Sequence, residues 1–134
     1  MRRFQHALTR PFAIHVASGH GPGVRATHGK VGKVGKEFSI EEGYQPARNA
    51  GLNMLSTVRD NLGSLDRVKK IVKVFGMVNV APWFVNTPKV IDGFSDLMVE
   101  VFGDAIGKHA RTAVGMAELP NNLPVEIEAV MEVE

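Results

Sequence analysis

The strict alternation of side chains over residues 125–133 restricts the fold of this chain more than any other feature. Val125, Ile127, Ala129, Met131 and Val133 alternate with Glu126, Glu128, Val130 and Glu132. A period of two is typical of a β-strand with one buried face. Another strand is predicted to open at Arg111, with the loop 120–122 joining the two. If the strands share a sheet, the guanidinium of Arg111 and the carboxylate of Glu126 can face one cleft.

A helix is predicted to follow a capping box formed by Ser39 and Glu42. Apolar residues then recur at helical spacing, and Gly63 is suited to end the helix. Pro46 removes a backbone donor, so the first turn is expected to be kinked or separate and the helix proper to span 46–62.

A second helix is predicted to begin with Thr87 as N-cap and Pro88 at the first helical position, and to stop at Gly103. Strands are predicted over 12–18 and 70–78. In the latter, one face is expected to carry Val72, Val74, Gly76 and Val78, and the other Ile71, Lys73, Phe75 and Met77.

The order of elements, which is strands, helix, strand, helix and two strands, predicts an α+β fold with two helices on one face of a mixed sheet. The 134 residues suffice for one domain, in which 1–13 match no expected element. The chain has no cysteine, which excludes disulfides and thiolate metal sites. Without an apolar run long enough to cross a bilayer, a cytosolic location is the default expectation.

Charge is distributed unevenly along the chain. The first 36 residues contain seven basic residues and no acid: Arg2, Arg3, Arg10, Arg25, Lys30, Lys33 and Lys36. Such a segment can contact nucleic acid, or it can be a solvated N-terminal region without a partner. The glycine-rich stretch 29–36 lacks the spacing of a P-loop and is predicted to be a flexible basic loop.

Four segments together resemble the Rid superfamily, the YjgF-like reactive-intermediate (imine/enamine) deaminases that are also labelled L-PSP endoribonucleases. They are Arg-Thr-Ala-Val-Gly-Met-Ala-Glu-Leu-Pro from 111, Val-Glu-Ile-Glu-Ala from 125, Val-Ala-Ser-Gly-His-Gly-Pro from 16, and the stretch 67–79. The resemblance covers about residues 14–133. It implies a chorismate-mutase-like fold and a homotrimer with a central barrel-like core and sites at the subunit interfaces.

The resemblance also implies roles for individual residues. Arg111 would hold the carboxylate of a 2-imino acid or enamine, and Glu126 would position or deprotonate the attacking water. The backbone of Ser18 and Gly19 would lie near the reacting atoms. Ammonia would be released and a 2-keto acid formed, without a cofactor. Judged from the residues alone, Arg111 could equally be paired with an acid, and Glu126 could belong to an exposed acidic stripe.

Several positions depart from the family pattern and point to a divergent subgroup. His20 stands where the closest deaminases have Gln, Ala113 where many have Cys, and Asp92 loosely where they have Asn. Trp83 and Phe84 are candidates for lining the pocket, or for a place in the core or an interface.

Other functions remain open at this stage. Four of the five histidines, His6, His15, His20 and His28, lie near the N-terminus, but their spacing matches no zinc signature, so no metal is expected. The principal alternative to a deaminase is a trimer that binds small carboxylate-bearing metabolites without turnover. A ribonuclease or translation inhibitor ranks third, because no acid–base pair suited to RNA is visible.

Overall fold

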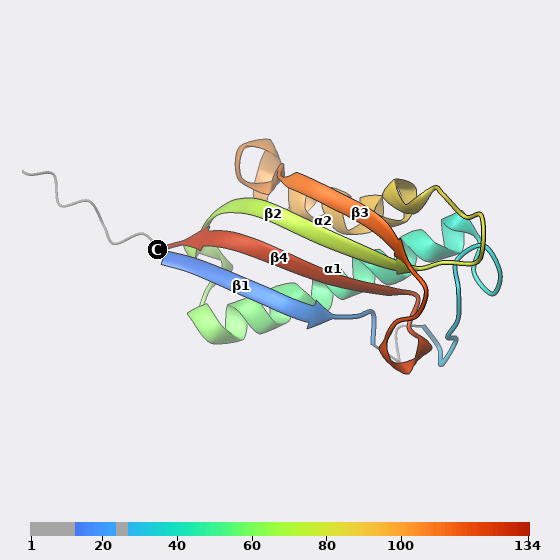
Figure 1. Cartoon of the computed structure of the whole chain (residues 1–134). Coiled ribbons are helices and arrows are strands. Elements are labelled where there is room, and N and C mark those ends of the chain that lie inside the picture. Colours follow the sequence, from blue (N-terminus) through green and yellow to red (C-terminus); the bar gives the residue numbers. More distant parts are fainter. Residues whose placement is uncertain (1–12, 24–26) are drawn as a thin grey trace, which may run out of the picture.

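The fold is taken from a computed structural model that describes residues 13–23 and 27–134 (Figure 1). Its elements are β1 (Ala13–His20), α1 (Ile40–Leu62), the 3-10 turn η1 (Leu65–Arg67), β2 (Val68–Asn79), α2 (Thr87–Gly107), β3 (Ala110–Met116), η2 (Pro120–Asn122) and β4 (Val125–Val133). This order confirms the predicted succession of elements. The unmatched N-terminal segment, apart from Ala13, lies outside the described residues.

The strands form one mixed sheet in the order β1-β4-β2-β3. β4 runs antiparallel to both β1 and β2, whereas β3 runs parallel to β2. Figure 1 shows the four strands side by side with both helices behind them. The last two strands, β3 and β4, thus share the sheet without being neighbours, because β2 lies between them.

Both helices pack on one face of this sheet, which confirms the α+β class. The core between the layers contains the odd-numbered residues of β4, together with Met54 of α1 and Phe94 of α2. On the opposite face, Ile14 and Val16 of β1 are 51% and 56% exposed. That face carries no second layer in the described part of the chain.

The alternation predicted for β2 is wrong at its beginning. Ile71 is fully buried and Val72 is 40% exposed, the reverse of the expected pattern. The register with β4 shifts between Ile71 and Lys73, and such a β-bulge moves the following side chains to the other face. From Val74 onward the predicted faces are correct.

The first helix begins as predicted but does not break. Ser39 Oγ accepts from the backbone of Glu42 at 3.1 Å, and Glu42 Oε2 accepts from the backbone of Ser39 at 2.8 Å. α1 then continues through Pro46, which is buried in it. The proline removes only the bond to the first-turn carbonyl of Glu42, so the predicted kink is wrong. Gly63 ends the helix at φ 85°, as predicted.

The second helix differs at both ends from the sequence prediction. Asn86 occupies the N-cap position, and the hydroxyl of Thr87 instead donates to the carbonyl of Ala113 at 3.0 Å. Gly103 interrupts the helix at φ 77°, and one further turn follows to Gly107. In the described part of the chain, neither this helix nor α1 is apolar enough over its length to cross a membrane.

Candidate functional site

Arg111 is fixed on the helix side of the sheet. Its strand position is paired with Val74, a core residue of β2, so its side chain points toward α2. Arg111 Nη1 donates to Asp92 Oδ1 at 2.8 Å and to Ser95 Oγ at 3.1 Å. These two acceptors use both hydrogens of Nη1. The edge formed by Nε and Nη2 is the one left to hold a carboxylate in a bidentate manner.

Ser95 is in turn bonded to a histidine that the sequence analysis did not single out. His109 Nε2 lies 2.9 Å from Ser95 Oγ, and His109 Nδ1 lies 2.6 Å from the carbonyl of Gly107. A carbonyl only accepts, so Nδ1 carries the proton and Nε2 accepts from the Ser95 hydroxyl. Burial lowers the pKa of His109, and the charges of Arg111 and Lys70 lower it further, which favours the neutral ring.

We call Asp92, Ser95, His109 and Arg111 the arginine cluster. A cavity of about 310 Å³ beside it is lined by Ser95, Val99, Lys108, His109 and Arg111. Its two cationic side chains and the apolar Val99 suit a small anion with a short apolar body. The Lys108 side chain is 68% exposed and pairs with Asp104, whereas that of Arg111 is 23% exposed and bonds to both Asp92 and Ser95, so Arg111 is the more firmly held cation.

Glu126 lies on the other face of the sheet. It alternates with the core residues Val125 and Ile127 and is paired with Met77 of β2. Close to it, the register of β1 shifts between Ala17 and His20, and Gly19 adopts φ 71°. A Cβ on Gly19 would lie 3.7 Å from Glu126 Oε1.

The chain thus brings the Ser18-Gly19 backbone and Glu126 together, and we call these three residues the glutamate cluster. The positive φ of Gly19 explains why glycine is used at this bend, since other residues are strained there. The bend directs the backbone of the β1 end toward the carboxylate. A water between them could be held by both.

The expectation that Arg111 and Glu126 share one cleft within a chain is wrong. β2 separates their strands, and their partners on β2, Val74 and Met77, are three residues apart. An odd separation along a strand places side chains on opposite faces. A single copy therefore carries two separate clusters rather than one complete site.

The other predicted pocket residues divide between several places. Asp92 joins the arginine cluster directly, and Ala113 follows Arg111 on the same strand face. His20 does not join Glu126, because its Nε2 lies 3.1 Å from Thr57 Oγ1 of α1. Its pKa is lowered by burial, with a smaller opposing effect from the Ser18 backbone.

The aromatic pair lies apart from both clusters. Trp83 is 96% exposed, which rules out a core position, and Phe84 is half-buried. Together with Lys33 they line a cavity of about 380 Å³ at the end of β2. A role for them in an interface remains a prediction.

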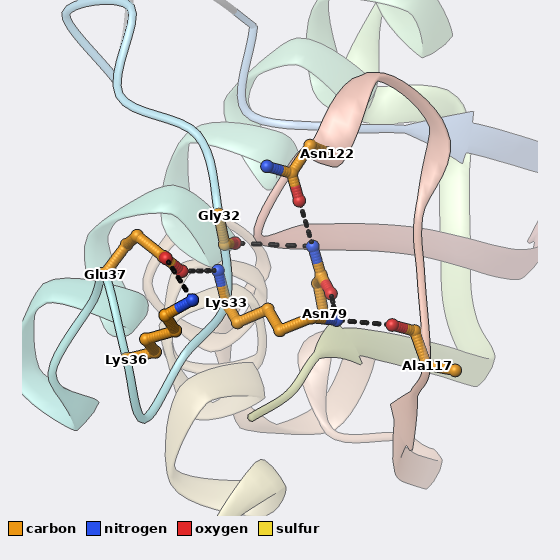
Figure 2. A network of polar contacts seen from close by, with 7 residues as sticks. All are labelled: Gly32, Lys33, Lys36, Glu37, Asn79, Ala117 and Asn122. Carbon is orange, nitrogen blue, oxygen red and sulfur yellow. Dashed lines mark hydrogen bonds and ion pairs between the residues drawn. The ribbon is translucent and has the colours of Figure 1, made fainter. Parts of the chain in front are cut away.

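The basic loop is held in place rather than flexible. Lys33 Nζ donates to Asn79 Oδ1 at 2.7 Å and to the carbonyl of Ala117 (Figure 2). Lys30 pairs with Glu42 at 3.2 Å, and Lys36 with Glu37 at 3.4 Å. The basic residues Arg2, Arg3, Arg10 and Arg25 lie outside the described residues, as does His6. Within 13–23 and 27–134, no three His, Asp or Glu side chains form a group that could hold a metal ion.

Comparison with known proteins identifies the family of this chain. A family model described as "YjgF/chorismate mutase-like, putative endoribonuclease" matches residues 11–128. The chain belongs to the YjgF/chorismate mutase-like family. Its membership confirms the resemblance to Rid proteins and the predicted fold.

Relatives of this YjgF-like chain include Protein TCP17 of Trypanosoma cruzi, 42% identical over 102 residues. The match covers 76% of this chain but only 64% of that relative. The crystal structure of Atu1372 from Agrobacterium tumefaciens, of unknown function, is 35% identical with a TM-score of 0.84, covering 92% of this chain and 82% of that one. A "putative endoribonuclease" from Shewanella oneidensis MR-1 is 30% identical with a TM-score of 0.82, covering 92% and 84%.

Proposed function

We propose that the protein is a cofactor-free hydrolase that deaminates reactive 2-imino and enamine acids. The site is shared between two copies of a homotrimer. One copy contributes the arginine cluster and another contributes the glutamate cluster. Family membership, the fixed arginine and the position of Glu126 against Gly19 support this function.

The chemistry follows from the two clusters. The Nε–Nη2 edge of Arg111 holds the substrate carboxylate, which places the adjacent C=N carbon at a fixed distance from the guanidinium. Glu126 accepts a proton from water as the water oxygen bonds to that carbon. The resulting carbinolamine is protonated on nitrogen and releases ammonia, which leaves a 2-keto acid.

The observation that carries the proposal is which hydrogen-bond donors of Arg111 are already used within the chain. Asp92 and Ser95 both bind Nη1, so they orient the guanidinium and leave its opposite edge for a carboxylate. A purely structural arginine gains stability from using all of its donors, whereas this one is held from one side. The half-buried Glu126 of a second copy would supply the base that the arginine cluster lacks.

Subunit complementation tests the shared site. Arg111→Ala and Glu126→Gln should each abolish ammonia release from 2-aminoacrylate generated in situ, while assembly is retained. Co-expressed and purified as mixed trimers, the two variants should regain about a third of wild-type activity, because one of the three interfaces in each mixed trimer combines an intact Arg111 with an intact Glu126. Mixed trimers as inactive as the single variants would exclude the shared site.

The alternative is a trimer that binds small carboxylates without turnover. The separation of the two clusters favours it, because binding a carboxylate needs the arginine cluster of one copy and no contribution from Glu126. This alternative predicts that 2-keto acids raise the melting temperature while no ammonia is released from any imino acid. Ammonia release that depends on both Arg111 and Glu126 would exclude it.

RNA cleavage, suggested by the family description, is the third reading. It requires activity that survives Arg111→Ala and falls when Lys30, Lys33 and Lys36 are neutralised. The three lysines are already engaged with Glu42, Asn79 and Glu37 respectively. Glu42 and Glu37 pair the charges of Lys30 and Lys36, and the ammonium of Lys33 is bound by Asn79 and the Ala117 carbonyl, which favours the small-molecule site over RNA.

A further inference from the structure

We propose that Ser95 and His109 are positioning residues that hold the guanidinium of Arg111 in the orientation that receives a carboxylate. The inference rests on the proposed function, because it concerns the anion end of the same site. Neither residue follows from the family match. The proposal rests on a continuous chain of hydrogen bonds that runs from the Gly107 carbonyl through His109, Ser95 and Arg111 to Asp92.

The direction of each bond in this chain is fixed. His109 Nδ1–H donates to the Gly107 carbonyl, so Nε2 can only accept, and it accepts from the Ser95 hydroxyl. With its proton directed at His109, Ser95 Oγ presents a lone pair to Arg111 Nη1 at 3.1 Å. The tautomer of His109 therefore determines which way the hydroxyl faces Arg111.

The packing around His109 holds the ring in this orientation. Phe94 of α2 meets it edge-on, with ring centroids 6.3 Å apart and an interplanar angle of 71°. Gly107 and Ser95 bind its two nitrogens from opposite sides. The ring is thus fixed by contacts that do not involve a ligand, so Arg111 is oriented before any ligand arrives.

The charges facing His109 come from three elements. Arg111 on β3 and Lys70 on β2 are cations and disfavour the protonated form of His109. Lys108, a third cation, is the neighbour of His109 in the loop before β3. α2 contributes the neutral Ser95 and Phe94, while its acids Asp92 and Asp104 are paired with Arg111 and Lys108. When acid does protonate His109, Nε2 becomes a donor and can no longer accept from Ser95.

Variants of the two residues test the role in the full-length chain. His109→Leu and Ser95→Ala should each weaken the binding of 2-oxobutyrate, measured by calorimetry, by about tenfold. His109→Gln can still accept from Ser95 and should restore near wild-type affinity. In turnover, His109→Leu should raise KM with little change in kcat, because it loosens binding and not the chemistry. His15→Gln on β1, at the opposite edge of the sheet, is the matched control and should change nothing.

A ligand-free readout separates positioning from stability. The Nε–H signal of Arg111 in NMR spectra should shift with pH together with the His109 ring, and this shift should vanish in His109→Gln. Wild-type affinity in His109→Leu, an Arg111 signal indifferent to His109, or a wild-type chain that does not bind 2-oxobutyrate would each overturn the inference. A chain that shows the His109-dependent affinity but releases no ammonia would overturn the deaminase function alone.

Discussion

Arg111 and Glu126 lie on opposite faces of one sheet, and the strand between their own strands keeps them apart. Arg111 is paired with Val74 and Glu126 with Met77. No side-chain rotation can bring the two groups into one pocket of a single copy. The proposed deaminase function therefore requires assembly, and the complementation experiment tests it directly.

Replacing Gly19 should damage the glutamate cluster more than it damages the fold. Gly19→Ala forces a side chain onto a residue at φ 71° and should cost about 1 kcal/mol of unfolding free energy. Relief of this strain would move the backbone away from Glu126, so ammonia release should fall at least as steeply. Gly63→Ala, at φ 85° with open space around it, is the control and should lose similar stability without losing activity. Equal activities for the two variants would contradict the role of the bend.

Removing the charge of Asp92 should strengthen anion binding. Asp92→Asn keeps an oxygen for Arg111 Nη1 but removes a negative charge 2.8 Å from it. Because the Asp92 side chain is 46% exposed, solvent screening limits the gain to a few-fold in the affinity for 2-oxobutyrate. Asp96→Asn, which removes a carboxylate bonded to Tyr44 one turn along α2, should leave the affinity unchanged. Weaker binding by Asp92→Asn would show that its charge assists the site.

The network around Asn79 should be a major source of stability for the basic loop. Asn79 is fully buried and bonds to Lys33, Asn122 and the carbonyl of Gly32 (Figure 2). It also donates to the carbonyl of Leu123. Asn79→Ala leaves several of these groups unpartnered and should lower the unfolding free energy by about 3 kcal/mol, measured by urea denaturation.

Asn53→Ala serves as the comparison for that variant. Asn53 makes an exposed hydrogen bond to the Gly21 carbonyl at 3.0 Å, so its loss should cost less than about 1 kcal/mol. Similar losses for the two asparagines would mean that burial adds nothing to the network.

Stability should decline in mild acid because of two histidines. Burial lowers the pKa of His20 and of His109 in the folded chain below the ordinary value of 6.5. Below that value the unfolded chain binds protons that the folded chain does not, so the unfolding free energy falls as pH drops through about 6.5. His20→Gln combined with His109→Gln should flatten this decline in urea titrations between about pH 7 and 5. An unchanged slope would assign the decline to other groups.

Local signals predicted the elements well. The alternation of β4, the capping box at Ser39 and the stop at Gly63 each depend on a few neighbouring residues, and each was confirmed. The errors concern tertiary context. The bulge that puts Ile71 rather than Val72 in the core arises from the pairing of β2 with β4. Thr87 does not cap α2, because its hydroxyl donates to a carbonyl of β3 instead.

The candidate site was predictable only in part for the same reason. The strand positions of Arg111 and Glu126 were correct, but their faces depend on the register of each strand against β2. Ser95 and His109 were missed because neither belongs to the matched motifs. Two regularities could have indicated them: Ser95 is about one helical turn after Asp92, and His109 is two residues before Arg111, immediately ahead of β3.

The crossover from β2 through α2 to β3 has a consequence for how specificity can change. Every member of the arginine cluster lies between positions 92 and 111, whereas the glutamate cluster joins the first described strand to the last. Under the proposed function, exchanging this one short segment for that of a relative would change carboxylate recognition and leave the glutamate cluster as it was. The proposed substrate preference and the proposed activation of water can therefore change independently.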